Sequence, residues 1–506
     1  MSLLAAQVHP IANGQALDFK DISTAGLDDF LQYVIEATEH HVRISSLFAQ
    51  PLEHDITRLW AILSYDHQSL VLPIYTDLAR NRYPSLTPYC AQAHWFEREL
   101  FEQIGIIPEG HPWLKPIRFQ PPFFPGARSG SAQHEIGMTD FFRVEGEEIH
   151  EVAVGPVHAG IIEPGHFRFQ CHGEDVFHLE ISLGYQHRGI EKALTGGPDR
   201  RTVHYMETAA GDTTVGHTLA YCQAIEALSG TEVPPRAQVL RGIALELERI
   251  ANHTGDLGAL AGDVGYLPTL SFCGRIRGDV LNMTAVLCGN RFGRGFLRPG
   301  GTGFDIDSGI RDDLLKRLQA VETDLKVAVD LLWNAPSVMA RFEGTGTVTR
   351  KLCDDIGLVG PAARACGADR DIRKDMPLGI FESSRIPVAT CDSGDVFARS
   401  KVRWLEIQSS IAFIREHLES PAAGAVLSPP APLAPNRLAV SLVEGWRGEI
   451  CHVALTDSEG RFARYKIVDP SFHNWFGLAC ALRDQQISDF PLCNKSFNLS
   501  YCGHDL

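Results

Sequence analysis

Three stretches of the 506-residue chain carry apolar residues at steps of three or four, and this spacing constrains the fold most strongly. Such a stripe runs along one face of an α-helix, so each stretch predicts a long helix that buries one side. The first stripe stops at Ser229-Gly230, the second opens at Pro234-Pro235, and the third stops before Pro336. The apolar positions are Val215, Leu219, Cys222, Ile225 and Leu228; Leu240, Ile243, Leu247 and Ile250; and Leu314, Leu318, Val321, Leu325 and Leu332. Several helices that each bury one stripe predict a helical bundle.

Residues 25–120 have a different character and predict a mixed α/β unit. Residues 42–48 and 70–75 are rich in β-branched and apolar side chains, which predicts strands, and residues 59–64 suit a third strand or a short helix. The stretch 91–104 carries an apolar stripe and is followed by Gly105, so it predicts a helix that ends there.

Proline and small residues then separate this unit from the rest of the chain. Prolines at positions 121, 122 and 125 are followed by GARSGSAQ, a composition that opposes regular structure. We therefore expect an N-terminal domain at 1–125, a linker at 126–150 and a second domain at 151–506. A proline-rich connector at 429–435 precedes a final α+β stretch. The expected class is α+β: a small mixed α/β domain, then a mainly helical-bundle domain with small β elements.

Composition excludes several functions. The formal net charge of -16 argues against a nucleic-acid binder, which normally carries a basic face. No stretch approaches the roughly 20 apolar residues of a membrane span, and the N-terminus lacks a basic signal-peptide region. The twelve cysteines include no CxxC pair, so we expect reduced, mostly buried thiols and no iron–sulfur or zinc site supplied by this chain alone.

Three segments carry a family resemblance. Residues 95–119 read WFERELFEQIGIIPEGHPWLKPIRF and resemble the signature of the 30-kDa-type subunit of respiratory complex I. Residues 155–169 (GPVHAGIIEPGHFRF) and 184–192 (GYQHRGIEK) are similar to the opening of the 49-kDa-type subunit, in the form found in group 4 membrane-bound NiFe hydrogenases. Residues 444–455 (EGWRGEICHVAL) resemble the hydrogenase segment that places an arginine beside the metals.

The resemblance implies a 30-kDa-like domain fused to a 49-kDa-like hydrogenase large-subunit domain. It also implies a 20-kDa-type small partner subunit that holds a [4Fe–4S] cluster, and a membrane arm formed by further subunits. The chain is then expected at the cytoplasmic face of the membrane, held there by its partners.

One feature of the family is missing from this chain. Hydrogenases bind nickel and iron through two pairs of cysteine thiolates, soft ligands that suit both metals. The first pair belongs to a Cys-Gly-x-Cys turn that is followed, after three intervening residues, by a histidine. This histidine matches His217, and the cysteine positions fall on Ala210 and Thr213. The second pair falls on Ser500 and Gly503, with Cys502 one residue out of register. We therefore predict that the chain binds no metal. The sequence stops at Leu506, just past this motif, which agrees with a chain that needs no processing after nickel insertion.

Four residues are the candidates for the site. Glu163 matches a carboxylate that hydrogenases use as a proton gate, and Arg447 matches the arginine beside the metals; a structural ion pair is the alternative for Glu163. His158 matches a quinone-contacting histidine of complex I, but Gly211 stands where the tyrosine of that pair is expected. Asp212 offers an oxygen ligand on the first turn, although a helix N-cap is the simpler interpretation.

Other polar residues in these segments have a structural interpretation. His166, His187 and His217 suit hydrogen-bonded structural roles as well as proton transfer. Arg188 and Glu191 are expected to form a local ion pair. The basic, glycine-rich stretch 290–301 lacks a phosphate-loop ending, so Arg277, Arg291, Arg294 and Arg298 are expected to contact a partner subunit or acidic groups of this chain.

Three functions remain open on the sequence. The first is a peripheral-arm subunit of a complex I-like oxidoreductase that couples events in this cleft to ion movement in a membrane arm. The second is a structural scaffold without a redox substrate, which a filled cleft favours. The third is a quinone-reducing subunit, which needs an apolar tunnel that reaches His158.

Overall fold

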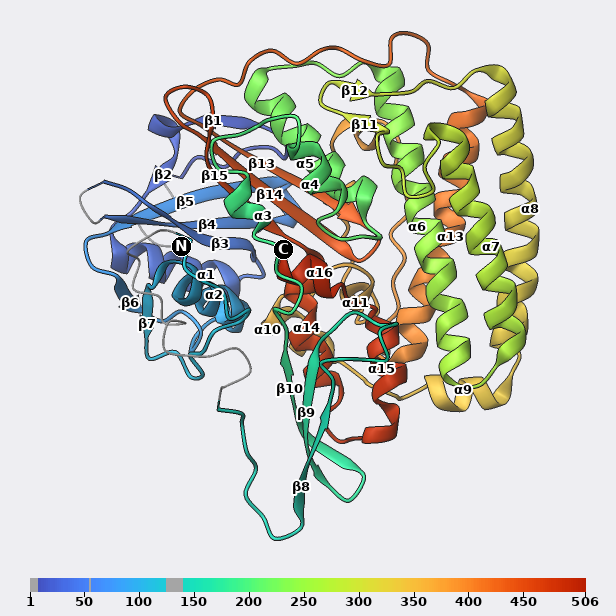
Figure 1. Ribbon diagram of the computed structural model, residues 1–506, viewed down its shortest axis with the longest axis horizontal. Helices are drawn as coiled ribbons and strands as arrows, with labels where there is room; N and C mark the ends of the chain where they lie inside the picture. Colours follow the sequence, from blue (N-terminus) through green and yellow to red (C-terminus); the bar gives the residue numbers. More distant parts are fainter. Residues whose placement is uncertain (1–7, 54–55, 124–139) are drawn as a thin grey trace.

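The computed structural model describes residues 8–53, 56–123 and 140–506. The N-terminal unit contains a four-stranded sheet in the order β2-β5-β4-β3, with α1 and α2 beside it (Figure 1). Its elements are β2 (Ser23–Thr24), α1 (Leu27–Glu39), β3 (Arg43–Pro51), β4 (Thr57–Tyr65), β5 (Leu70–Leu78), β6 (Arg82–Pro84), α2 (His94–Ile104) and β7 (Ile107–Glu109). The predicted strands and the helix ending at Gly105 are confirmed, and residues 59–64 form a strand. Gly105 adopts a left-handed φ of 81°, which suits glycine at a helix end.

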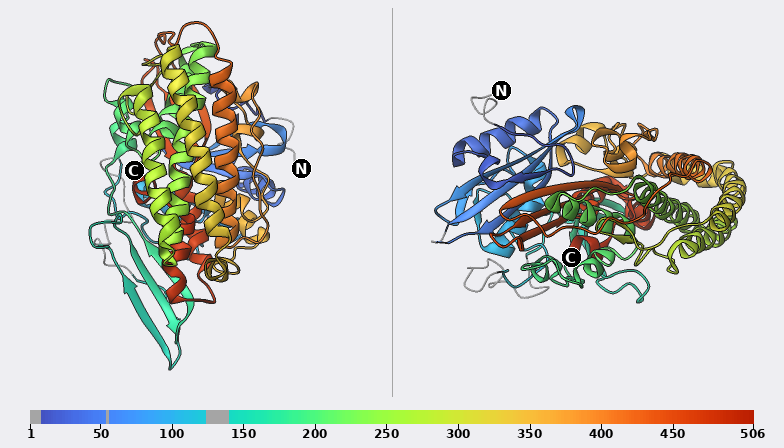
Figure 2. Two further views of the ribbon diagram at one scale, coloured as in Figure 1. Left: turned by 90° about the vertical axis from the view of Figure 1, so that its right-hand side faces the viewer. Right: turned by 90° about the horizontal axis from the view of Figure 1, so that it is seen from above.

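Long helices form a layer on the opposite side of the molecule (Figures 1 and 2). α6 packs against α7 and α13, and α7 packs against α8. The stripes predicted from spacing are buried in α5, α6 and α8, and the helix ends at Gly230, Pro235 and Pro336 agree with the prediction. The helices of the second domain are α3 (Ile190–Ala193), α4 (Thr202–Glu207), α5 (Thr214–Ser229), α6 (Pro235–Asp263), α7 (Leu267–Cys288), α8 (Ser308–Trp333), α9 (Pro336–Phe342), α10 (Arg350–Ile356), α11 (Gly360–Arg364), α12 (Ile372–Asp375), α13 (Val396–Glu419), α14 (Pro470–Ala481), α15 (Phe490–Phe497) and α16 (Tyr501–Asp505).

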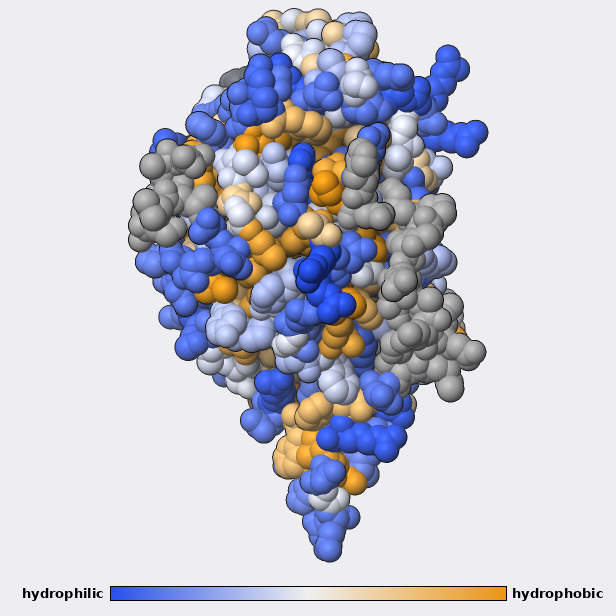
Figure 3. Space-filling view, turned by 90° about the vertical axis from the view of Figure 1, so that its left-hand side faces the viewer, coloured by the Kyte–Doolittle hydropathy of each residue, from blue (hydrophilic) through white to orange (hydrophobic). Residues whose placement is uncertain are grey.

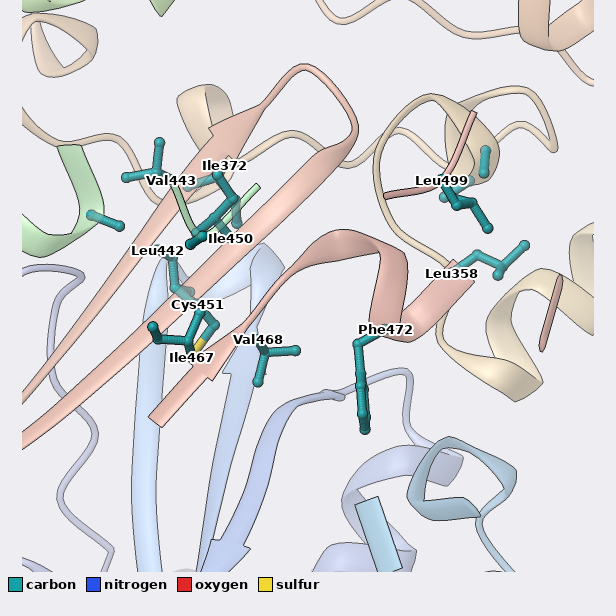
Figure 4. Close-up of a cluster of buried hydrophobic side chains, with 14 of the residues drawn as sticks. Leu358, Ile372, Leu442, Val443, Ile450, Cys451, Ile467, Val468, Phe472 and Leu499 are labelled. Carbon is teal, nitrogen blue, oxygen red and sulfur yellow. The ribbon is translucent and has the colours of Figure 1, made fainter. Parts of the chain in front are cut away.

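A central sheet lies between the helical layer and the N-terminal unit. Its order is β1-β13-β14-β15, formed by Ala16–Asp18, Arg437–Gly445, Gly448–Thr456 and Phe462–Val468. α5 packs on one face of this sheet. Leu442, Cys451 and Val468 occupy matching positions across three strands and belong to the buried apolar cluster drawn in Figure 4. β1 comes from the N-terminal end of the chain, so the first strand completes the sheet of the second domain.

Buried ion pairs also join the two units. Arg43 on β3 contacts Glu449 on β14 at 2.6 Å, and Lys466 on β15 contacts Glu99 on α2 at 2.8 Å. These side chains are almost completely buried. Separating a buried ion pair leaves an uncompensated charge in the interior, which is strongly destabilising, so these pairs hold the two units in one orientation.

A second sheet projects from the body of the molecule (Figure 1). Its order is β16-β10-β9-β8, formed by Gln485–Gln486, Asp175–Ser182, His166–His172 and Ile149–Val154. Figure 3 shows this projection as a tapering extension that ends in hydrophilic residues. The remaining strands, β11 (Leu297–Arg298) and β12 (Gly301–Thr302), form a small hairpin. The greater part of the predicted linker, 126–139, lies outside the described residues.

Two further expectations concern side chains and membranes. All twelve cysteines are free, and only Cys391 and Cys502 are partly exposed, so the prediction of buried thiols is confirmed. Within the described ranges, no helix has the length and apolar character that a membrane crossing requires.

Candidate functional site

Two segments far apart in the sequence meet beside the tip of the β13–β14 hairpin. The turn before α5, residues 208–213, is linked to the C-terminal segment 498–503 by two arginines. Arg447, at the hairpin tip, donates to the Asp212 carboxylate and to the carbonyl oxygen of Asn498. Arg188 donates to the carbonyl oxygens of Ala209 and Cys502, both within 3 Å. The guanidinium groups therefore tie the two segments together.

The Arg447–Asp212 pair is the main electrostatic feature of this site. The two nitrogens of Arg447 lie 2.6 and 2.7 Å from the two carboxylate oxygens, and its guanidinium stacks 3.9 Å from the Trp446 ring centroid. Burial alone would raise the pKa of Asp212, but the arginine outweighs burial and lowers it. The Asp212 side chain keeps 34% of its exposure, whereas that of Arg447 keeps 3%. The pair thus remains charged at the boundary between the interior and the solvent.

A chain of hydrogen bonds runs from the same site into the core. Asp469 accepts from His217 at 2.9 Å, His217 contacts His452 at 3.1 Å, and His452 contacts the Tyr465 hydroxyl at 2.9 Å. All four side chains are almost fully buried. Burial opposes the charge of Asp469, but the bond from His217 lowers the pKa of this carboxyl, so it is ionised.

Two members of this chain are uncharged. Burial lowers the pKa of His452 and raises that of Tyr465, so both are neutral. Nε2 of His217 donates to the Asp469 carboxylate, and this bond stabilises the charge of the buried carboxylate.

Glu163 and His158 lie on the loop between β8 and β9 that borders the C-terminal segment. Glu163 is half-buried and accepts weakly from the Cys502 amide at 3.4 Å. Burial and the Glu163 carboxylate raise the pKa of the Cys502 thiol to about 11, so the thiol stays protonated. His158 contacts the carbonyl oxygen of Gly165 at 2.8 Å within its own loop, and the same loop exposes Val157 and Ile161. The structure thus brings Glu163 to the site and leaves His158 bonded inside the loop.

Glu248 is a site residue that the sequence interpretation missed. It lies on α6, is half-buried, and accepts from the amides of Val215 and Gly216 at the start of α5, at 2.7 and 3.1 Å. Burial raises the pKa of Glu248 to about 8, and the Asp212 carboxylate adds to the shift, against the two amide bonds. Asn252 donates to the carbonyl oxygens of both Asp212 and Glu248, which holds the two residues together.

Comparison with known proteins gives a consistent result. A model of the respiratory-chain NADH dehydrogenase 49 Kd subunit matches residues 263–437, and one of the 30 Kd subunit matches residues 21–128. The carbon monoxide-induced hydrogenase of Rhodospirillum rubrum is 33% identical over 69% of this chain and 97% of that protein. Formate hydrogenlyase subunit 5 of Escherichia coli is 28% identical over 85% of this chain and 78% of that protein. Membrane-bound hydrogenase subunit alpha of Pyrococcus furiosus is 29% identical over 69% of this chain and 85% of that protein.

The chain belongs to the complex I and group 4 hydrogenase family. The predicted fusion of 30-kDa-like and 49-kDa-like domains is confirmed, as is the α+β class. The predicted likeness to group 4 hydrogenases is confirmed by the named relatives.

The resemblance to NiFe hydrogenases implies a metal centre held by four thiolates, and the side chains at the matching positions of this chain do not fit that centre. Ala210 is fully buried, and Thr213 receives hydrogen bonds from Trp446 and Arg447. Ser500 caps α16 by accepting from the amide of Gly503. A Cβ atom on Gly503 would lie 2.7 Å from Cγ of Asp469, so a cysteine there would overlap this carboxylate. None of the four side chains is a thiolate, and carboxylates and a guanidinium surround them.

Two expectations about local contacts are wrong. Asp212 does not cap α5: the N-cap position is Thr213, without a side-chain bond, because the Asp212 carboxylate is taken by Arg447. Arg188 and Glu191 do not pair: Arg188 bonds to backbone carbonyls, and Glu191 contacts Lys466 and Arg464. Asp212 and Glu191 both pair with buried basic side chains from distant segments, and these pairs replace the expected local contacts.

The structure also shows the contacts of the remaining histidines and of the basic stretch 290–301. His217 joins the buried chain to Asp469, while His166 and His187 contact the backbone carbonyls of Gly155 and Asp505. Gly295 of the basic stretch donates its amide to Glu207 on α4. Partner contacts by the arginines of this stretch remain a prediction.

Proposed function

We propose that this chain is the peripheral-arm subunit of a membrane-bound, complex I-like oxidoreductase that couples electron transfer to ion translocation without a NiFe centre. The family membership supports an oxidoreductase subunit, since relatives carry the names of hydrogenase and NADH-quinone oxidoreductase subunits. By analogy with them, the chain docks a 20-kDa-like iron–sulfur subunit that holds a [4Fe–4S] cluster, and further subunits form the membrane arm at the cytoplasmic face.

One observation carries the metal-free part of the proposal. Arg447 and Asp212 form a bidentate ion pair beside the segments that match the metal-binding segments of hydrogenases, and Asp469 lies where a Gly503 side chain would have to be. The resemblance implies that thiolates join these segments through the metals in a hydrogenase; in this chain Arg447 and Arg188 join them. The chain therefore holds these segments together with its own side chains.

The site contains groups that can exchange protons. Glu163 and Glu248 are half-buried carboxyls near the Arg447–Asp212 pair, and the pKa of Glu248 is about 8. A carboxyl that titrates near the working pH exchanges protons efficiently. Asp469, His217, His452 and Tyr465 form a buried chain of hydrogen bonds. We infer that the site responds to a redox event in the partner subunit by taking up or releasing a proton.

The scaffold function is the second candidate, and the two arginine bridges favour it. Arg188 joins backbone carbonyls of the two segments, and Arg447 joins the Asp212 carboxylate to the carbonyl oxygen of Asn498, which is a structural role. The quinone alternative needs a headgroup contact at His158, whose ring nitrogen is bonded to Gly165 inside its own loop. A quinone that displaces this bond remains a proposal to test by competition with quinone analogues.

Purification of a tagged chain from detergent-solubilised membranes tests the proposal. We expect an iron–sulfur subunit and membrane subunits to co-elute with the chain in constant proportion. When the complex is reconstituted into lipid vesicles and its electron donor is supplied, we expect it to move ions across the vesicle membrane. Electron transfer without ion movement would contradict the coupling. If an intact complex showed no electron transfer and no ion movement, the result would favour the scaffold function.

A further inference from the structure

The face of the central sheet opposite α5 carries two carboxyl groups at directly opposed positions. Glu444 on β13 pairs in register with Glu449 on β14, and both are at least 97% buried. Opposed residues in an antiparallel pair project from the same face, and like charges there repel. The two residues flank the hairpin tip that carries Trp446 and Arg447.

Each of the two carboxyl groups shares its arginine with another acid. Glu444 accepts from Arg364 at 2.8 Å, and Arg364 also contacts Glu406 at 2.8 Å. Glu449 accepts from Arg43 at 2.6 Å through one oxygen, and Arg43 also holds Asp66 at 2.7 Å. The second oxygen of Glu449 is buried without a hydrogen-bond partner. Neither glutamate therefore has a guanidinium of its own.

Counting the buried charges around this pair leaves an excess of acid. The elements packed there contribute the carboxyl groups of Asp66, Glu246, Asp371, Glu406, Glu444 and Glu449 and the guanidinium groups of Arg43, Arg249, Arg364 and Arg373, all less than 9% exposed. Six acids thus face four arginines. His253 is neutral, because burial lowers its pKa, and at the rim Arg370 pairs with Asp354 and Lys374 with Asp369 and Asp375.

Four acids of the cluster are better compensated than the opposed pair of Glu444 and Glu449. Glu406 has contacts with Arg364, Arg249 and His253, and Glu246 has contacts with Arg249, Arg373 and Ser410. Asp371 and Asp66 each form a two-oxygen pair with an arginine. Glu444 has one oxygen on the shared Arg364 and the other on the amide of Ile372 at 3.1 Å.

A buried, uncompensated carboxylate is unfavourable, and the interior relieves it by binding a proton. Burial and the nearby Asp371 raise the pKa of Glu444 to about 7, against the attraction of Arg364 and its neighbours. The opposed positions and the excess of acid therefore indicate that this pair of glutamates holds one proton, and the raised pKa assigns that proton to Glu444.

We propose that Glu444 is a proton-binding site that loads and releases one proton beneath the cleft while the surrounding ion pairs stay charged. The proposal rests on the proposed function of the cleft, and it names the residue that stores the proton. Glu444 becomes a neutral acid when it takes a proton from water, and it returns the proton to water as a carboxylate. No electron moves at this residue.

The position of Glu444 links this proton to the Arg447–Asp212 pair. Arg249 donates to the backbone carbonyls of Glu444 and Gly445 at 2.7 and 3.1 Å, which fixes the base of the hairpin. Arg447 lies three residues further on and pairs with Asp212. A surface cavity of about 560 Å³ is lined by Arg373, which pairs with Asp371. Loading Glu444 removes one negative charge from the base of the hairpin that carries Arg447.

Infrared difference spectroscopy of the purified full-length chain, titrated through neutral pH, tests this proposal. We expect the carbonyl band of a protonated, buried carboxylic acid to disappear as the pH rises through about 7. The band should shift in heavy water. Glu444→Gln should lose the part that titrates near 7 and keep the part from Glu248, which titrates near 8. Glu419→Gln, which changes an exposed acid at the end of α13, should keep both parts.

The outcomes separate this proposal from the function of the whole complex. A wild-type chain without such a band overturns the proposal, and this result needs no variant to fold. A band that titrates near 7, is unchanged in Glu444→Gln and is lost in Glu248→Gln also overturns it, because the proton then belongs to Glu248. A band assigned to Glu444 in a complex that moves no ions would contradict the proposed coupling and leave the proton site intact.

Discussion

Arg447 and Asp212 lie 235 residues apart in the sequence and form a two-oxygen ion pair with nitrogen–oxygen distances of 2.6 and 2.7 Å. The same guanidinium reaches the carbonyl oxygen of Asn498, so one side chain joins three segments of the chain. In relatives that bind metals, thiolates from two of these segments would meet at the metals. In this chain the ion pair holds these three segments together through side chains alone.

Replacing Arg447 by Met should lower the free energy of unfolding by about 3 kcal/mol. This loss lies at the low end for a broken buried pair, because a third of the Asp212 side chain is exposed. Urea denaturation measures it. Arg275→Met removes exposed pairs with Asp279 and Asp324 and should cost less than about 1 kcal/mol. Equal losses of unfolding free energy in the two variants would mean that the Arg447 pair stabilises the fold no more than an exposed ion pair does.

Gly503→Ala tests whether Asp469 occupies the space of the lost cysteine. The new methyl group would lie 2.7 Å from the carboxylate carbon, so the free energy of unfolding should fall by about 1–3 kcal/mol. The matched variant Gly274→Ala, on an open face of α7, should raise stability by up to about 1 kcal/mol. Thermal denaturation compares them. An unchanged Gly503→Ala protein would show that the two groups are not in contact.

Much of the fold was predictable because local spacing determines it. The stripes of α5, α6 and α8 and the caps at Gly230 and Pro235 depend on neighbours within one helix. Arg447 was also predictable, from its motif. The N-cap assigned to Asp212 was wrong because a distant arginine takes its carboxylate.

The polar interior of the site was not predictable from the sequence. Asp469 and His452 lie more than 230 residues from His217, and no local pattern joins them. Glu248 sits on a helix whose spacing predicts only an apolar seam, and its role appears only when α5 begins beside it. Likewise, the three residues of β1 give no signal that they pair with β13.

Glu444→Gln should flatten the pH dependence of stability between the ordinary and the raised pKa of this acid. The pKa in the folded protein is about 7, above the ordinary 4.5, so the folded state binds the proton more tightly. The contribution is therefore complete below the ordinary pKa, declines as pH rises toward 7, and is absent above it. The decline in wild type is on the order of 3 kcal/mol. Denaturation at a series of pH values measures it. A variant with the same slope as the wild type would contradict the assignment.

Tyr465→Phe should destabilise the protein through the chain that ends at Asp469. The substitution removes the hydrogen-bond partner of Nδ1 of His452 and leaves this buried nitrogen unpaired, which costs about 1–2 kcal/mol. Tyr89→Phe, at a tyrosine that is 74% exposed, serves as the control and should change stability little. Urea denaturation that finds equal stability for Tyr465→Phe and wild type would show that the bond contributes nothing.

The most direct test of the central claim is the metal content of the purified complex, measured by mass spectrometry together with hydrogen-dependent dye reduction. The account predicts iron from the partner's cluster, no stoichiometric nickel and no hydrogen oxidation, because Ala210, Thr213, Ser500 and Gly503 supply no thiolate. One nickel per chain with hydrogen uptake would contradict it and would make this subunit a hydrogenase.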